Sequence, residues 1–518
     1  MPNTHPLFDD ITPVYEPGED PISTRVTLVE MSNSTKVRQK FMGHLQSALN
    51  GQFEQAALTP MRGYERHAIG CASERYLREK LLLQGEANDA KWCHQLVKWG
   101  AISADVFPTD VFKRLLDHRL DKVATTADPK VFLPPNAAIS KPTLISKTAG
   151  AVVPTGATLA VPANAKIDWH LNDRGANVVA AWQKFLDRNP PSPDLPWKDI
   201  VVGHLDTGYI AHEALAWDIS ATPPVSTTVL HTRGHDYFEI PQDADPKDPW
   251  ISSGFPGHGT RIAGAISGFD PRDQKHPYYG SAPGVQIIPY RVTDSVIADH
   301  VPHHIADAID QARSDDCHII TVCLGALRGS SRVARAVDQA YGKGMIVVCA
   351  AGQVWPWVIY PGRFNRVMTV SGIGPSGSPW GSAASGKYVD WCAPADQIRR
   401  LKIKPGQNGN FETGINPTAD GDGTSYATAI TSGIAAMWLA WHGVQNLREK
   451  YAGQEWMIPA AFKKLVKASC NPWPAGSAGK TGYGVGVINA SKLLDQPLPD
   501  AGTLNKEAAA NAGFDALH

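Results

Sequence analysis

The chain has 518 residues, of which 43% are hydrophobic and 19% are charged, and its formal net charge is −1. This composition is typical of a globular protein with a sizeable core. The balanced charge argues against a nucleic-acid partner, since phosphate binding usually requires a basic excess. No run approaches the roughly 18 apolar residues of a membrane span, so we expect none.

The N-terminal sequence has neither the basic stretch nor the apolar stretch of a secretory signal. We therefore expect a chain that is cytoplasmic as synthesised, and export by a signal-independent route stays open. The seven cysteines are odd in number and lack CxxC spacing. Three of them lie in apolar runs, so we expect buried free thiols in a reducing compartment.

The first part of the chain, residues 1–120, is predicted to be a mainly helical regulatory domain or pro-region. Residues 1–33 are polar and proline-punctuated, which indicates extended chain. Apolar residues then recur at spacings of three or four, which predicts helices over 34–58, 66–85 and 87–102. We expect this region to assist folding or to inhibit, and an unrelated interaction module is the alternative.

Residues 121–165 are rich in Pro, Ala and Thr without a helical period, which indicates a linker or an extended arm that could be a site of self-cleavage. Residues 166–495 alternate short β-branched runs with helical segments. This pattern predicts an α/β domain with a mostly parallel sheet and helices on both faces. Residues 496–518 form a C-terminal tail, which we expect to be weakly ordered from Pro499. The strands are expected at 199–208, 285–292, 317–325, 345–352 and 366–374, and the helices at 258–268, 303–314, 331–344 and 425–443.

Three short motifs in this region can carry chemistry. Asp206 ends an apolar run at Asp-Thr-Gly, so its carboxylate would lie at the carboxyl edge of a parallel sheet, where ligands bind. His258 opens a helix between two glycines, and the positive helix end favours the neutral ring. Ser425 lies at the start of a strongly apolar helix, where free N–H groups face a developing oxyanion.

Each motif has a simpler interpretation when it stands alone. Asp-Thr-Gly is a common turn, His258 could be a structural histidine, and Ser425 could only cap its helix. Together they are more specific, because a serine nucleophile needs a base and the base needs an orienting carboxylate. The order Asp, His, Ser is also that of one of the three unrelated serine-protease arrangements.

The motifs DTG, GHGTxxAG and GTSxA, in this order, resemble the three signatures of the subtilase family. Similar blocks occur at 168–182, 280–292, 319–326 and 347–372, so the resemblance covers about 330 residues. It implies a subtilisin-like three-layer fold and a catalytic triad of Asp206, His258 and Ser425. In two places the chain departs from the family pattern: Gln353 replaces the usual Asn of the oxyanion hole, and Ala429 replaces a Pro after the serine.

The resemblance also implies that two short segments form the walls of the substrate pocket. Their edges are expected to be exposed and to pair with an extended peptide as an added strand. Their small side chains predict an open pocket that accepts large apolar residues. The residues concerned are Leu324, Gly325 and Ala326 in one wall and Ala350, Ala351 and Gly352 in the other.

The function predicted on this basis is that of a serine endopeptidase acting on proteins or peptides. Two alternatives are a catalytically impaired binding protein on the same fold and a transpeptidase or macrocyclase with the same triad. No cofactor is required and no metal ligands are predicted. The acid-rich segments 242–248 and 418–422 match no calcium-loop motif, so solvated loops are favoured and structural calcium stays open. The oligomeric state stays open.

Overall fold

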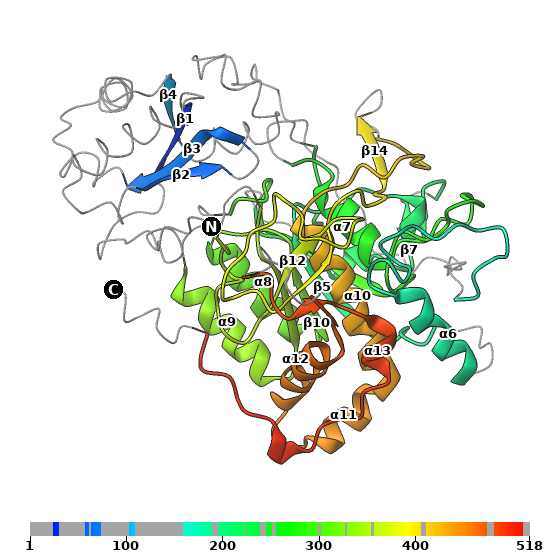
Figure 1. The fold of residues 1–518 in the computed structure, drawn as a ribbon. Helices are drawn as coiled ribbons and strands as arrows, with labels where there is room; N and C mark the ends of the chain where they lie inside the picture. The colour runs from blue at the N-terminus through cyan, green and yellow to red at the C-terminus, as the bar shows by residue number, and fades with distance from the viewer. Residues whose placement is uncertain are drawn as a thin grey trace. The chain divides into compact units, whose positions relative to one another are not determined.

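In the computed structural model the chain is divided into two compact units (Figure 1). One unit includes residues 1–141, and the other includes residues 142–353 and 358–512. The residues described in the first unit are 24–30, 57–61, 64–73 and 103–108. The description of the second covers 159–510 except 189–194, 222, 239–244, 251–254, 299–301, 327–328, 354–356, 406–410 and 474–480.

The described residues of the N-terminal region form a four-stranded antiparallel sheet in the order β2-β3-β1-β4. The helix expected over 66–85 is wrong for residues 66–73, which belong to β3. Gly70 would cost such a helix about 1 kcal/mol, and β1, far away in the sequence, pairs with residues 67–73 of β3. The other expected helices lie almost entirely outside the described residues. The strands are β1 (Thr24–Glu30), β2 (Ala57–Met61), β3 (Tyr64–Ser73) and β4 (Ser103–Pro108).

The second unit is built on a nine-stranded sheet in the order β16-β17-β13-β12-β11-β10-β5-β9-β8. Neighbouring strands are parallel except for β16 and β17. The mostly parallel sheet and its five expected strands are therefore confirmed. The strands are β5 (Val201–Asp206), β8 (His235–Asp236), β9 (Gln286–Arg291), β10 (Ile319–Val322), β11 (Ile346–Ala350), β12 (Met368–Ile373), β13 (Trp391–Pro394), β16 (Asn471–Pro472) and β17 (Gly486–Val487).

Helices cover both faces of this sheet. Helix α7 packs against α10, whereas α8 packs against α9. The strands of the sheet lie between these two pairs, with α7 and α10 on one face and α8 and α9 on the other (Figure 1). The four expected helices, α7 to α10, are confirmed. The helices are α6 (Val178–Arg188), α7 (His258–Ser267), α8 (Pro302–Ser314), α9 (Ser331–Gly342), α10 (Thr424–His442), α11 (Val444–Lys450), α12 (Met457–Ser469) and α13 (Ala490–Leu494).

Helix α10 is the central element of the core, and it packs against α7 and against β10 to β13 (Figure 1). Every residue from Thr424 to Leu439 is buried. A helix that is apolar on all sides is stable only when it is surrounded by protein. Its N-terminal end is therefore held rigidly near the carboxyl edge of the sheet. Two hairpins, β6 (Trp217–Asp218) with β7 (Val225–Ser226) and β14 (Lys402–Pro405) with β15 (Phe411–Gly414), lie outside the sheet.

The C-terminal segment 499–510 differs from the weakly ordered tail that we expected. It contains a short 3-10 helix, η8 (Ala501–Thr503), and it buries Leu504 and Ala510. Glu507 accepts a hydrogen bond from the Arg366 backbone N–H at 2.7 Å and pairs with Lys463 at 2.9 Å. The segment is held by residues that lie far away in the sequence. Its own sequence has no periodic pattern, so it did not predict that the segment would pack against them.

Five cysteines of the described part of the second unit are free and buried, which confirms this expectation for them: Cys317, Cys323, Cys349, Cys392 and Cys470. Within the part of the chain that the structure describes, no helix is long and apolar enough to cross a membrane.

Candidate active site

Asp206 is the last residue of β5, a strand whose residues are all buried. The side chain of Asp206 is 1% exposed, and its Oδ1 accepts a hydrogen bond from the Thr207 N–H at 2.8 Å. Burial by itself raises the pKa of this carboxyl. The charge and hydrogen bond of His258, together with His204, more than offset burial and hold the pKa below its ordinary value. The carboxylate is therefore ionised at neutral pH.

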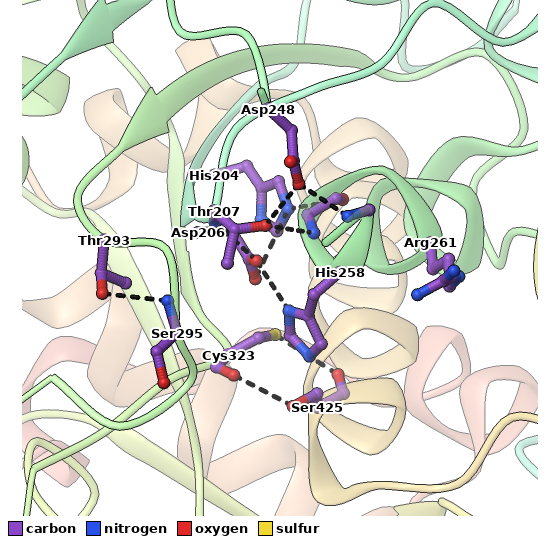
Figure 2. Close-up of polar contacts among 12 residues, drawn as sticks. His204, Asp206, Thr207, Asp248, His258, Arg261, Thr293, Ser295, Cys323 and Ser425 are labelled. Carbon is purple, nitrogen blue, oxygen red and sulfur yellow. Dashed lines mark hydrogen bonds and ion pairs between the residues drawn. The ribbon is translucent and has the colours of Figure 1, made fainter. Parts of the chain in front are cut away.

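His258 begins helix α7, and its Nδ1 lies 2.6 Å from Asp206 Oδ1 (Figure 2). The carboxylate accepts the Nδ1–H, so Nε2 is the nitrogen left without a proton in the neutral ring. A tight turn brings this helix start to the sheet edge: Gly257 has a φ of 71°, a conformation that favours glycine. A side chain at Gly259 would overlap the carbonyl oxygen of Gly208. The glycines on both sides of His258 are thus explained by close packing of α7 on the Asp-Thr-Gly turn.

Asp248 supports this arrangement, and the sequence did not single it out as a site residue. Its Oδ2 accepts hydrogen bonds from Thr207 Oγ1 at 3.1 Å and from the Gly257 N–H at 2.7 Å. Thr207 Oγ1 in turn accepts the Gly259 N–H at 3.1 Å. Asp248 is 4% exposed, and burial raises the pKa of its carboxyl. The prediction that 242–248 is a solvated loop is therefore wrong for Asp248, because two buried donors, the Thr207 hydroxyl and the Gly257 N–H, need this acceptor.

His204 is a second buried histidine beside the same carboxylate. Its Nε2 donates to the Gly259 carbonyl at 3.0 Å and lies 3.8 Å from Asp206 Oδ2 (Figure 2). Burial lowers the pKa of His204 and keeps the ring neutral. It ties β5 to the first turn of α7, so it helps to set the distance between Asp206 and His258. Nothing in the apolar run around His204 predicted this role from the sequence.

Ser425 lies in the first turn of α10 and is 9% exposed. In Figure 2 the second ring nitrogen of His258 points toward the segment that holds Ser425. The Ser425 hydroxyl donates to the Cys323 carbonyl at 3.0 Å, and the Cys323 thiol donates to the Ser425 carbonyl at 3.3 Å. The structure thus brings the three predicted residues to one edge of the sheet. In this structure the Ser425 hydroxyl is hydrogen-bonded to the Cys323 carbonyl.

Gln353 follows β11 and reaches the N-terminus of the same helix. Its Oε1 accepts the Thr424 N–H at 2.9 Å, and the Gly352 N–H donates to Thr424 Oγ1 at 3.2 Å. Gly423, with a φ of 148°, leaves room for the amide, since a side chain there would lie 3.1 Å from Gln353 Oε1. The extra methylene of glutamine is accommodated because its amide binds the helix end directly.

The two expected wall segments lie side by side because β10 and β11 are parallel neighbours. Their edges, however, are not open. The Gly325 N–H donates to Val296 O at 2.9 Å, and Gly325 O accepts the Ala298 N–H at 2.8 Å. Ala326 exchanges two such bonds with Tyr360. The expectation of exposed edges is therefore wrong at Gly325 and Ala326, whose backbone groups already have partners within the chain.

The space between the walls is not open either. A side chain on Gly325 would overlap Ile359 Cδ1, and one on Gly352 would lie 3.0 Å from Ile359 Cγ1. The small wall residues predicted an open pocket, and Ile359, contributed by the following loop, contradicts that prediction. Among the described residues, no group of three or more His, Cys, Asp or Glu side chains is arranged to hold a metal ion.

Comparison with known proteins agrees with this architecture. The model of the subtilase family, peptidase S8, matches residues 197–484. The thermostable alkaline protease of Halalkalibacterium halodurans is 30% identical over 182 residues, which cover 35% of this chain and 46% of that protein. Subtilisin E of Bacillus subtilis is 27% identical over 218 residues, 41% of this chain and 52% of that protein. The chain thus spans about half the length of the curated relatives it matches.

Among solved structures, a protease of Pseudoalteromonas arctica aligns with a TM-score of 0.47 and 21% identity, covering 63% of this chain and 96% of that one. MycP1 of Mycobacterium smegmatis aligns with a TM-score of 0.46 and 20% identity, covering 67% and 89%. The family match extends over more than half of the chain and includes all three motifs. The chain therefore belongs to the subtilase family.

Proposed function

We propose that this subtilase is a serine endopeptidase that hydrolyses peptide bonds through Asp206, His258 and Ser425 and an acyl-enzyme intermediate. The observation that carries the proposal is the hydrogen bond of 2.6 Å between His258 Nδ1 and the buried Asp206 carboxylate. That bond fixes the tautomer in which Nε2 is the free base, and Nε2 faces the segment of Ser425 (Figure 2).

Acylation requires the Ser425 hydroxyl to turn from the Cys323 carbonyl to His258 Nε2. The proton of Oγ then moves to Nε2 while Oγ bonds to the carbon of the scissile carbonyl, whose oxygen becomes an oxyanion. Asp206 stabilises the imidazolium that forms. When the carbon–nitrogen bond breaks, the imidazolium gives its proton to the leaving amine. Water completes the cycle: its oxygen bonds to the acyl carbon while His258 Nε2 takes its proton, and the imidazolium then returns that proton to Ser425 Oγ as the ester bond breaks and the acid product leaves.

The oxyanion would be held at the N-terminus of α10. The Ser425 N–H belongs to the first turn of the helix, where N–H groups have no partner within the helix. Gln353 adds a side-chain donor, because with Oε1 on the Thr424 N–H its Nε2 is available beside the same helix end. Donors fixed in advance stabilise an oxyanion without the reorganisation that water would need.

The experiment that tests this function is labelling of the purified full-length chain with a fluorophosphonate probe, followed by intact mass analysis. We expect one label on the wild type and none on Ser425→Ala. Ser432→Ala is a matched control, since Ser432 is a buried serine of the same helix that donates to Thr428 O at 3.0 Å. It should keep the label.

Peptide substrates complete the test. Hydrolysis products that contain the elements of water support an endopeptidase, whereas products joined to an added amine indicate a transpeptidase. A chain that is neither labelled nor active on any peptide contradicts the proposal and leaves the catalytically impaired binding protein as the better explanation.

A further inference from the structure

Ile359 is attached by its backbone to one wall of the substrate pocket and, through its neighbour, to the other. Its N–H donates to the Ala351 carbonyl at 3.0 Å. The next residue, Tyr360, donates its N–H to Ala326 O at 2.9 Å and accepts the Ala326 N–H at 2.8 Å. Ile359 therefore cannot swing away without breaking bonds to both wall segments.

The Ile359 side chain lies over the glycine of each wall. It reaches Gly325 so closely that a side chain there would overlap Cδ1, and a side chain on Gly352 would lie 3.0 Å from Cγ1 and 3.1 Å from Cδ1. Gly325 and Gly352 therefore leave space that Ile359 itself occupies. Ile359 is only partly buried. Its exposed surface therefore limits the depth of the space that remains between the two walls.

The chemistry fixes which substrate side chain faces this space. The Ser425 hydroxyl donates to the carbonyl of Cys323, which is the residue directly before the first wall. Gln353 directly follows the second wall. His258 has to face the leaving nitrogen, to which it gives a proton. The α-carbon on the acyl side of the attacked carbonyl then lies away from His258, between the two walls. The side chain of that residue, called P1, is the one that meets Ile359.

We propose that Ile359 closes the floor of this pocket and restricts P1 to small, uncharged side chains such as those of glycine, alanine and serine. This inference rests on the proposed endopeptidase function. The described side chains of the two walls and of Ile359 carry no charge, so nothing among them would pair with a charged P1 residue. Large apolar side chains are excluded by volume rather than by polarity.

The test compares kcat/KM for N-acylated tetrapeptide 4-nitroanilides that differ only in alanine, leucine or phenylalanine at P1. The full-length wild type should prefer alanine to phenylalanine by a factor of roughly 10 to 100, in line with the range for misfit groups in apolar pockets. Ile359→Gly and Ile359→Ala should raise kcat/KM for the phenylalanine peptide by a similar factor, and Ile359→Val by less.

Two controls keep the result interpretable. Ile219→Gly removes the same side chain from a residue that is 48% exposed and lies on the turn after β6, and it should leave the preference unchanged. Thermal unfolding of each variant shows whether it is folded, and Ile359→Ala answers the question if the glycine variant is not.

The outcomes separate this inference from the function beneath it. A wild type that is labelled at Ser425 but cleaves the phenylalanine peptide as well as the alanine peptide overturns the role of Ile359 alone. An unchanged preference in folded Ile359→Ala does the same. Absence of both labelling and hydrolysis overturns the proposed function, and this inference with it.

Discussion

At the scale of single residues, the Gln353 carboxamide lies at the N-terminus of α10, where the oxyanion of the proposed reaction would be bound. Its Oε1 accepts the Thr424 N–H at 2.9 Å, which fixes the amide against the first turn of α10. With Oε1 used as an acceptor, Nε2 is the donor that the amide could offer to an oxyanion. In the proposed reaction, glutamine would replace the asparagine that the family usually has, because the longer side chain is hydrogen-bonded to the helix end.

This geometry predicts that the Gln353 amide acts mainly in the transition state. Gln353→Ala should lower kcat by about 10²–10³ with little change in KM, the usual loss for one oxyanion donor. Gln353→Glu keeps an acceptor for the Thr424 N–H but removes the donor, so it should lose at least as much. Steady-state kinetics with a single peptide measures both, and an unchanged kcat in Gln353→Ala would mean that backbone N–H groups suffice.

At the scale of elements, the segments around the site are held by parts of the chain that are distant in sequence. Val296 and Ala298 pair with Gly325, and Tyr360 pairs with Ala326. An extended peptide that used the backbone of Gly325 would have to take the place of the Val296–Ala298 segment. The C-terminal segment contacts the connection between β11 and β12, which also contains Tyr360. There Arg366 Nε donates to the Glu507 carbonyl at 3.0 Å.

Docking of residues 499–510 predicts that they contribute to stability. Deletion of 500–518 removes Leu504 from the core, and loss of one buried apolar side chain costs roughly 1.5–3 kcal/mol. It also leaves Arg366 and Lys463 without Glu507. We expect a clearly lower midpoint of urea unfolding. Deletion of 511–518 alone keeps all these contacts and is the control. Equal stability of the two truncated chains would contradict this prediction and support the weakly ordered tail that we expected from the sequence.

At the scale of the whole molecule, several histidines of the described residues have a pKa below the ordinary value; among them His170, His204 and His212 are buried, and His318 and His442 are half-buried. Burial is the main cause in each case, because the charged ring loses its hydration. For His212 the pKa falls to about 4 despite the nearby Glu213 and Asp270, which raise it. Arg272 acts in the same direction as burial.

These shifts predict acid sensitivity in a defined pH range. The folded protein keeps the rings neutral, whereas the unfolded chain binds protons from about pH 6.5 downward. Stability should therefore be full above about pH 6.5 and fall as the pH decreases toward about 4. The lowered pKa of Asp206 acts at lower pH. A shift such as that of His212 corresponds to roughly 3 kcal/mol.

Urea unfolding between pH 4 and pH 7.5 measures this effect. The His212→Asn variant is matched, because its oxygen can accept the Ala214 N–H that His212 Nδ1 now accepts at 3.1 Å. The variant does not titrate, so its stability should fall less over this range. The same slope in both proteins would assign the acid sensitivity to other groups.

The sequence by itself determined the elements with a strong local pattern and the residues at their ends. Apolar runs predicted β5, β9, β10, β11 and β12, and the motifs placed Asp206, His258 and Ser425 where a parallel sheet brings strand ends and helix starts together. These predictions succeeded because the periodicity and glycine turns that define them are local. The role of residues 1–165 remains a prediction.

Contacts between distant segments were decided only by the tertiary structure. Gly70 and its neighbours form a strand because β1 pairs with them, and Asp248 is buried because Thr207 and Gly257 donate to it. The wall residues considered alone predicted an open pocket, but Ile359 lies against Gly325 and Gly352 and fills the space between them. In each case the deciding partner lies elsewhere in the chain, and only folding brings the two together.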